Sequence, residues 1–508
     1  MSGSTEQSNS TATCDPLPTV THTSRVTWSF VVVLLVALVA RVAMVVLWQR
    51  QLGAEPFGFG DSTSYWDLAR DLATGESYAY GWSEARCFRT PGYPLILAPL
   101  FWLYENPPVL AARAISVAFG IGLVALTYSV AQRFGGRAVA TLAALGVALS
   151  PELVFSSALV LSETPFDFLL VLQLLIWLWY REARSPIGRA GHAVLLGSVT
   201  AFSILVRPSW LPAALVWGVA LAFARRGRPR LNEGTVALVS DEAFELSVAS
   251  RGQAIAVYAL GLLLVLSPWW VRNARLYDTF VPTSLQTGAS LWDGLQANAT
   301  GASDMSEIDA LRLRYVRERM TALLDESSRA SWEARLPVSA DSPDYWPTIK
   351  RELPPLWNEL RTRDTSLPRF ELAFDRYLGD LAKSQAADAP GRVASLGLEK
   401  FWRIWSPWPQ EGLGRSTVAR AVFALGFGVL LVGLLFRVAA ILTDAGSIRH
   451  LDTWMLALPA VFFTLLHMIY VASIRYREPA LPGLFIMAAV GIHYWQSRWA
   501  VNRSAKER

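Results

Sequence analysis

Long blocks of consecutive apolar residues recur along this chain and limit what it can fold into. Most of the blocks hold about 20 residues, which is the length that a helix needs to cross the hydrocarbon core of a bilayer. Hydrophobic residues make up 53% of the 508 residues and charged residues only 17%, whereas soluble domains carry about 25% charged residues. Because an unpaired backbone cannot face lipid, each block must form a helix. The sequence therefore predicts an all-α polytopic membrane protein.

Ten blocks are expected to span the membrane, and the charges between them indicate their orientation. Arg residues gather in alternate links and in the C-terminal tail, whereas the link 151–163 contains no Lys or Arg. Because cytoplasmic loops are enriched in basic residues, we expect both termini on the cytoplasmic side of the cell (inner or plasma) membrane. The net charge of +5 then reflects topology, and no nucleic-acid partner is expected. The predicted spans are 28–48, 109–131, 137–150, 164–180, 191–206, 209–224, 254–270, 418–436, 453–472 and 480–496.

The blocks also divide the chain into parts with different roles. Both long hydrophilic loops fall on the predicted outer side, so we expect any chemistry there. Within the larger loop, helices are expected at 307–324 and 370–383. The expected parts are a disordered cytoplasmic tail at 1–24, an N-terminal transmembrane core at 25–270 with the first outer loop at 49–108, a mainly helical extracytoplasmic domain at 271–417, C-terminal transmembrane helices at 418–496 and a basic cytoplasmic tail at 497–508.

The first outer loop contains two candidate helices at the membrane surface. The segment from Asp61 to Gly75 predicts one short amphipathic helix, because Asp61 suits an N-cap and Gly75 a C-terminal stop. Apolar side chains from Tyr65 to Leu72 recur on one face at helical spacing. Pro91 suits the first turn of a second interfacial helix.

Short motifs follow one another on the predicted outer side. They are Asp61…Tyr65…Gly75, Arg89-Thr-Pro91-Gly-Tyr93-Pro94, Ser162-Glu163, Arg207-Pro208, Pro268-Trp269 with Arg272-Asn273, Phe280-Val-Pro282 with Gly288 and Leu291-Trp292, and Arg475-Tyr476 with Pro479 and Pro482. Their order resembles the polytopic glycosyltransferases of the protein O-mannosyltransferase and lipid A aminoarabinose transferase group, which are similar to glycosyltransferase family 39. The resemblance covers nearly the whole chain except the middle of the 271–417 loop. It implies a GT-C-type core of transmembrane helices. The chain departs from the family at Ser62, where a second acidic residue is frequent.

The resemblance also implies a reaction. A sugar would move from a polyprenyl-phosphate donor to an acceptor hydroxyl on the outer side, in one inverting step, catalysed by a hexosyl- or pentosyltransferase. Such a step needs a carboxylate that takes the acceptor's proton and cations that hold the phosphate as charge develops on it. By motif, Asp61 is the expected base, Glu163 is a second catalytic carboxylate or lines the site, and Arg89 is the expected phosphate ligand. No cofactor or metal is expected.

Further side chains are expected to contact the substrates. Arg86, Arg207, Arg272 and Arg475 would bind the lipid phosphate together with Arg89, and Arg477 lies in the same stretch as Arg475. The aromatic residues expected to contact the sugar or the acceptor are Tyr65, Tyr93 and Tyr476. The expected partners are the lipid-linked donor, membrane lipids and an acceptor that is a protein, a lipid or a polysaccharide.

Each of these predictions has a structural alternative. Asp61 would serve only as a helix cap, Glu163 as a hydrated residue at the edge of a span, and the arginines as interfacial anchors. For the whole chain, one alternative is a transporter or flippase of lipid-linked sugars, which would use the same cations. Another is a non-catalytic receptor or assembly factor, which would not need the ordered outer motifs. A transporter should show repeated halves and a charge at the membrane midplane. The sequence has no clear repeat, and Arg41 is the one basic residue well inside a predicted span.

Overall fold

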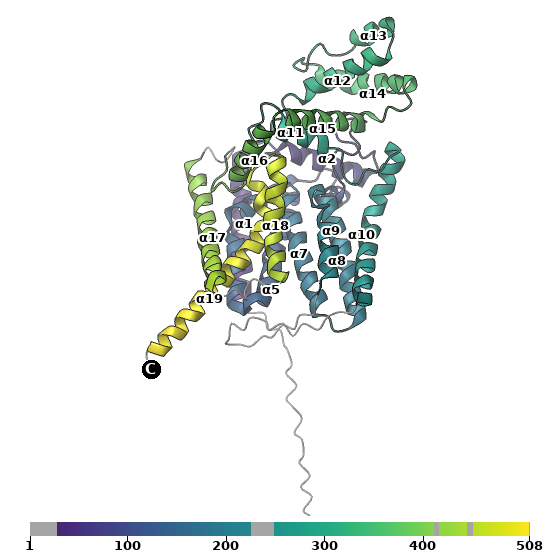
Figure 1. Ribbon diagram of the computed structural model, residues 1–508. Helices are drawn as coiled ribbons and strands as arrows, with labels where there is room; N and C mark the ends of the chain where they lie inside the picture. Colours follow the sequence, from purple (N-terminus) through teal and green to yellow (C-terminus); the bar gives the residue numbers. More distant parts are fainter. Residues whose placement is uncertain (1–27, 225–247, 411–415, 444–450, 507–508) are drawn as a thin grey trace, which may run out of the picture.

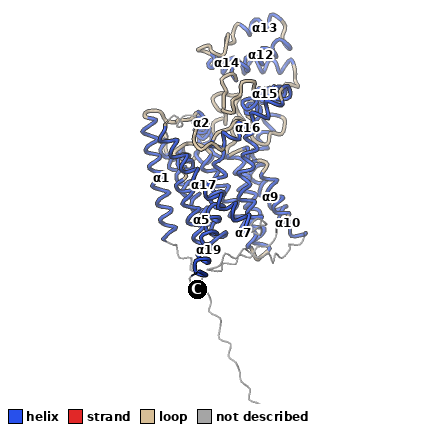
Figure 2. The backbone as a smooth tube through the Cα atoms, turned by 60° about the vertical axis from the view of Figure 1, so that its left-hand side comes forward, coloured by secondary structure: helices blue, strands red, loops and turns tan. Residues whose placement is uncertain are grey.

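The computed structural model describes residues 28–224, 248–410, 416–443 and 451–506. The predicted tail at 1–24 lies outside these residues. Throughout this described part, the chain forms helices joined by loops and contains no strand. A bundle of long helices carries a smaller helical domain above one end (Figures 1 and 2). The predicted all-α class is confirmed.

Six helices in the described residues are long and apolar enough to cross a membrane. Their lengths and composition place the chain in a bilayer. They are α1 (Trp28–Leu52), α5 (Val109–Leu149), α8 (Pro186–Val206), α10 (Val248–Tyr277), α17 (Thr417–Thr443) and α18 (Leu451–Ile469).

The other predicted spans are helical as well. The range 137–150 is the second half of α5, and the range 209–224 is a 3₁₀ turn followed by a short apolar helix. Two further helices, α7 (Glu163–Glu182) and α19 (Leu481–Lys506), begin or end with polar residues, which lower their mean hydropathy. That these four segments also cross the bilayer stays a prediction. In the range 209–224, the 3₁₀ turn is η1 (Pro208–Trp210) and the short helix is α9 (Ala213–Ala222).

A glycine pair divides α5 into two segments. Its 41 residues would extend about 60 Å as one helix, twice the roughly 30 Å of a hydrocarbon core. The backbone departs from helical geometry at Gly135 and Gly136, and Gly136 has a φ of 68°, in the left-handed region that favours glycine. The Ser116 hydroxyl donates to the Leu159 carbonyl at 3.1 Å. The segment that follows α5 therefore lies beside the first part of α5. The helices predicted on either side of the pair are therefore both present.

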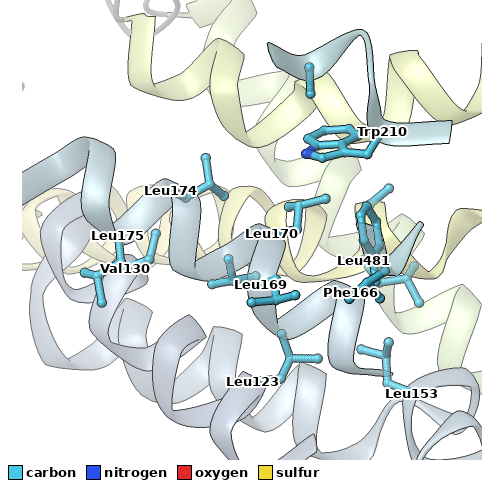
Figure 3. Packing of buried hydrophobic residues seen from close by; sticks show 14 of the residues in the cluster. Leu123, Val130, Leu153, Phe166, Leu169, Leu170, Leu174, Leu175, Trp210 and Leu481 are labelled. Atoms are coloured by element: carbon cyan, nitrogen blue, oxygen red, sulfur yellow. The ribbon is translucent and has the colours of Figure 1, made fainter. Parts of the chain in front are cut away.

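The helix α7 lies in the centre of the bundle, with apolar side chains packed on several of its faces. Figure 3 shows Leu170 and Phe166 of α7 among side chains from neighbouring elements, including Trp210 and Leu481. The rings of Phe166 and Trp210 meet edge to face, with centroids 5.7 Å apart. Because lipid tails are as apolar as these side chains, close packing stabilises the bundle more than the hydrophobic effect does.

The domain above the bundle has a hydrophobic core of its own. Side chains such as Val316, Leu353, Trp357 and Phe370 are buried together in it. The helices expected at 307–324 and 370–383 are confirmed as α12 and α15. The elements are α11 (Thr287–Leu295), α12 (Ile308–Leu323), α13 (Glu326–Glu333), α14 (Tyr345–Arg363), α15 (Phe370–Asp388) and α16 (Pro390–Ile404).

Short elements lie at the same end of the bundle as this domain. Among them, the fully buried Arg477 binds Glu152 and donates to the carbonyls of Ile404 at 3.1 Å and Ser406 at 2.6 Å. Arg477 therefore joins the bundle to the end of α16. The short elements are α2 (Gly60–Thr74), α3 (Gly92–Leu97), α4 (Pro99–Leu103), α6 (Pro151–Ser156) and η4 (Ile474–Ala480).

Candidate active site

The helix α2 positions Asp61, although not as the sequence predicts. The helix begins at Gly60 with Phe59 as its N-cap, and within the described residues no side-chain cap hydrogen bond forms at this end. The prediction that Asp61 is the N-cap is therefore wrong, because the helix begins at Gly60 and Asp61 lies inside its first turn, where its carboxylate makes other contacts. Gly75 ends the helix in the left-handed conformation, with a φ of 73°, as predicted.

Four charged side chains form an alternating chain of contacts at this end of the bundle. Arg89 Nη2 lies 2.5 Å from Asp61 Oδ1, and Arg475 Nη2 lies 3.9 Å from Asp61 Oδ2. The same Arg475 nitrogen lies 2.6 Å from Glu163 Oε1. The fold therefore brings together four residues that lie up to 414 positions apart in the sequence. We call them the charged chain.

The four side chains of the charged chain differ in exposure, and Asp61 is the most exposed of them. The side chain of Asp61 is 46% exposed, those of Arg475 and Arg89 are 23% and 17% exposed, and that of Glu163 is 4% exposed. Asp61 is thus the carboxylate that a molecule from the aqueous side can reach. Glu163, at the start of α7, is instead covered, and its partner Arg475 comes from η4.

Arg89 is held on several sides. Its Nη1 donates to Gln286 Oε1 at 3.1 Å, and its Nε donates to Ser64 Oγ at 3.4 Å. Its guanidinium carbon lies 5.1 Å from the centre of the Tyr65 ring, a distance at which a cation and an aromatic face attract each other. The position of Arg89 against Asp61 therefore depends on side chains from two other segments.

Arg207 lies among aromatic rings beside the charged chain. Its guanidinium carbon is 5.6 to 5.9 Å from the ring centres of Tyr476, Phe166 and Phe463. The Tyr476 ring also stacks on His467 at 3.9 Å. Two buried nitrogens here, Arg207 Nη1 and the Nε of Arg475, have no hydrogen-bond partner among the described residues. Buried donors without partners are costly, so these two nitrogens are available to bind an anion.

The other two predicted tyrosines, Tyr65 and Tyr93, lie near Arg89 and the start of α7. The Tyr65 hydroxyl is 3.4 Å from the Ser162 hydroxyl, next to Glu163 in the sequence. Tyr93 is fully buried, and its ring meets that of Tyr65 edge to face at 4.9 Å. Tyr65 thus lines the charged chain directly, while Tyr93 packs behind it.

The remaining predicted phosphate ligands, Arg86 and Arg272, lie in a separate contact group. Arg272 donates to the carbonyls of Tyr78 at 3.3 Å and Arg86 at 3.0 Å. The Arg86 side chain donates to the Ser83 carbonyl at 3.0 Å. These contacts hold the loop that carries Arg89.

Sequence reasoning does not find three residues that bear on this site. Gln286 binds Arg89, and Glu371 and Asp375 of α15 bind backbone N–H groups of the segments that carry Arg89 and Gln286. The one available signal was the motif around Gly288, which points to the segment of Gln286 but not to its partner.

A comparison with protein families finds a match over part of the chain. The family model of dolichyl-phosphate-mannose-protein mannosyltransferases matches residues 83–274. That range contains Arg89, Glu163 and Arg207, while Asp61 and Arg475 lie outside it. No curated protein matches the chain in sequence.

Solved structures extend the similarity over most of the chain. The archaeal oligosaccharyltransferase AglB from Archaeoglobus fulgidus, in complex with an inhibitory peptide and a dolichol-phosphate, shares 12% identity at a TM-score of 0.51 and covers 94% of this chain. The apo form of the Archaeoglobus fulgidus oligosaccharyltransferase shares 13% identity at the same TM-score and covers 95%. In both cases this chain spans 52% of the other protein's length. ArnT from Cupriavidus metallidurans, bound to undecaprenyl phosphate, shares 13% identity over 90% of this chain and 77% of its own, with a TM-score of 0.40 that is too low to support an argument.

Proposed function

We propose that this chain, which has the GT-C membrane fold, is a glycosyltransferase that uses a polyprenyl-phosphate-linked sugar. The transfer takes place on the extracytoplasmic side of the cell membrane, and both termini are cytoplasmic. The observation that carries the proposal is the half-exposed carboxylate of Asp61, within 4 Å of two arginines. An acidic group beside clustered cations suits the transfer of a group from a phosphate to a hydroxyl.

The proposed reaction is a single displacement with inversion. The acceptor oxygen bonds to the anomeric carbon of the sugar while the bond from that carbon to the phosphate oxygen breaks. The electron pair of the broken bond leaves with polyprenyl phosphate, and the proton of the acceptor passes to Asp61. Asp61 is suited to this role because it is the most exposed member of the charged chain.

The phosphate is proposed to lie against Arg475 and Arg207, with Arg89 as a third ligand. Arg475 Nε and Arg207 Nη1 are buried nitrogens without a hydrogen-bond partner among the described residues, and phosphate oxygens would satisfy both. The similar archaeal oligosaccharyltransferase was solved with a dolichol-phosphate, a lipid phosphate of the proposed class. Glu163 is proposed to hold Arg475 in place through their 2.6 Å contact.

The direct test is a donor screen with the purified protein in lipid vesicles. Several polyprenyl-phosphate hexoses and pentoses are supplied with hydroxyl-bearing acceptors, and the release of free polyprenyl phosphate is measured. We expect release with at least one donor, in step with glycosylation of the acceptor. If every donor binds but none releases polyprenyl phosphate, the proposal is overturned and the transporter of lipid-linked sugars is favoured.

Arg89→Ala should weaken binding of polyprenyl phosphate. The guanidinium supplies charge-assisted hydrogen bonds, so we expect the dissociation constant to rise about 10- to 100-fold. The matched control is Arg70→Ala on the exposed face of α2, where Arg70 pairs with Asp67 at 3.6 Å. An unchanged dissociation constant for Arg89→Ala would remove this residue from the phosphate site.

Glu163→Gln should lower turnover about tenfold, because a neutral amide loses about 1.5 kcal/mol or more of a charge-assisted contact. Arg475 would then be free to move towards Asp61. Glu182→Gln, at the other end of α7 and paired with Arg133 at 2.8 Å, is the control. Turnover by Glu163→Gln at the wild-type rate would mean that Glu163 is only a residue at the edge of a span.

A further inference from the structure

The helix α15 faces the bundle with two carboxylates one turn apart. Figure 1 shows α15 beside α11, between the bundle and the helices α12, α13 and α14. Glu371 and Asp375 both accept hydrogen bonds from backbone N–H groups outside the helix. An adjacent face of α15 contributes Phe370 and Phe374 to the core of the outer domain. The helix therefore links that core to the end of the bundle.

Glu371 holds the loop that carries Arg89. Its carboxylate accepts the N–H of Arg86 at 2.9 Å and the N–H of Cys87 at 3.0 Å. It also accepts a hydrogen bond from the hydroxyl of Tyr277, at the end of α10. Arg86 and Cys87 precede Arg89 by three and two residues, so Glu371 fixes the backbone from which the Arg89 side chain extends.

Asp375 holds the segment that carries the other partner of Arg89. It accepts the N–H of Gly288 at 2.8 Å and that of Ala289 at 3.4 Å. These residues follow Gln286, whose amide oxygen binds Arg89 at 3.1 Å. A Cβ atom on Gly288 would lie 1.8 Å from the Asp375 carbonyl oxygen, so only glycine permits this approach.

The two segments are also bonded to each other. The N–H of Leu285 donates to the Cys87 carbonyl at 2.9 Å. Arg89 therefore extends from a small unit whose two sides are both attached to α15. We propose that Glu371 and Asp375 are positioning residues, through which the outer domain sets the place of Arg89 against Asp61. This inference rests on the proposed function, because it assigns a role in catalysis to the contact between Arg89 and Asp61.

The charge state of Glu371 makes the attachment sensitive to pH. Burial raises the pKa of Glu371 to about 7, against the opposing effects of the hydrogen bonds from Tyr277, Cys87 and Arg86 and the charge of Arg272. Burial also raises the pKa of the Cys87 thiol, so that this neighbour stays neutral near pH 7. An ionised carboxylate accepts backbone N–H groups more strongly than a neutral acid does. Turnover should therefore fall as the pH decreases through about 7, because the loop loosens when Glu371 takes up a proton.

The test is a double-mutant cycle between Glu371→Gln and Arg89→Lys, with turnover measured from pH 5.5 to 8.5. We expect Glu371→Gln to lower turnover about tenfold in the wild-type background and less than twofold beside Arg89→Lys, since coupled residues are not additive. The step near pH 7 should disappear in Glu371→Gln. Asp380→Asn, on the exposed face of α15 with a side chain that is 77% exposed, should change neither quantity.

Equal losses in both backgrounds, or a step near pH 7 that persists in Glu371→Gln, would overturn the positioning role. The same four proteins are also assayed for binding of polyprenyl phosphate, where Glu371→Gln should weaken binding only when Arg89 is present. A wild type that transfers no sugar from any donor overturns the proposed function, and the binding cycle then still decides on the positioning role. If Glu371→Gln does not fold, Asp375→Asn takes its place in the cycle.

Discussion

Asp61→Asn should abolish sugar transfer while leaving the fold and donor binding in place. Asparagine has the same shape and can still accept a hydrogen bond from Arg89, but it cannot take the acceptor's proton. Because general base catalysis contributes about 10²- to 10⁴-fold, we expect a loss of that size in the single-turnover rate of polyprenyl phosphate release. The cost to stability should be small, since Asp61 is half exposed and caps nothing in the described structure.

The matched control is Asp67→Asn on the same helix. Asp67 pairs with Arg70 at 3.6 Å and is outside the charged chain, so its substitution should leave the rate unchanged. The donor dissociation constant of Asp61→Asn is measured in parallel to separate chemistry from binding. A rate for Asp61→Asn within a few fold of the wild type would rule out Asp61 as the base.

Arg477→Met should cause the largest loss of stability. Arg477 is fully buried, binds Glu152 and donates to two carbonyls at the end of α16. Its removal leaves the carboxylate of Glu152 buried without its cation, which costs about 3–5 kcal/mol. Thermal unfolding in detergent should show a clear decrease in the midpoint, because a change of this size is a large part of the stability of a typical domain.

A second variant tests the physical reason for that loss. Arg477→Met combined with Glu152→Gln removes both charges, so it should unfold at a higher temperature than Arg477→Met alone. Arg351→Met, on the exposed surface of the outer domain, should have little effect. A midpoint for Arg477→Met equal to that of the wild type would show that the buried pair adds nothing to stability.

The membrane core could be predicted from the sequence because lipid leaves the backbone few choices. Each apolar block had to be a helix, and the glycines at 135 and 136 mark the turn inside α5. The outer motifs placed Asp61, Arg89, Glu163 and Arg475 on one side of the membrane. The structure then brings these four residues into contact.

The contacts that depend on distant segments could not be predicted. Gln286 lies 197 residues from Arg89, and Glu371 lies 285 residues from Arg86. Local patterns carry no information on such pairs. Arg475 and Arg477 also look equivalent in sequence, yet Arg475 reaches Glu163 and Arg477 reaches Glu152. Only the geometry of η4 separates a residue of the charged chain from one that supports the fold.

The exposure of Asp61 has a consequence for fidelity. As the proposed base, an Asp61 side chain that is 46% exposed could remove a proton from water as well as from an acceptor hydroxyl. Attack by water would hydrolyse the donor to free sugar and polyprenyl phosphate and leave the acceptor unmodified. Under the proposed mechanism, an acceptor that covers Asp61 when it docks would exclude water, so the ratio of transfer to hydrolysis would depend on how well each acceptor covers this carboxylate.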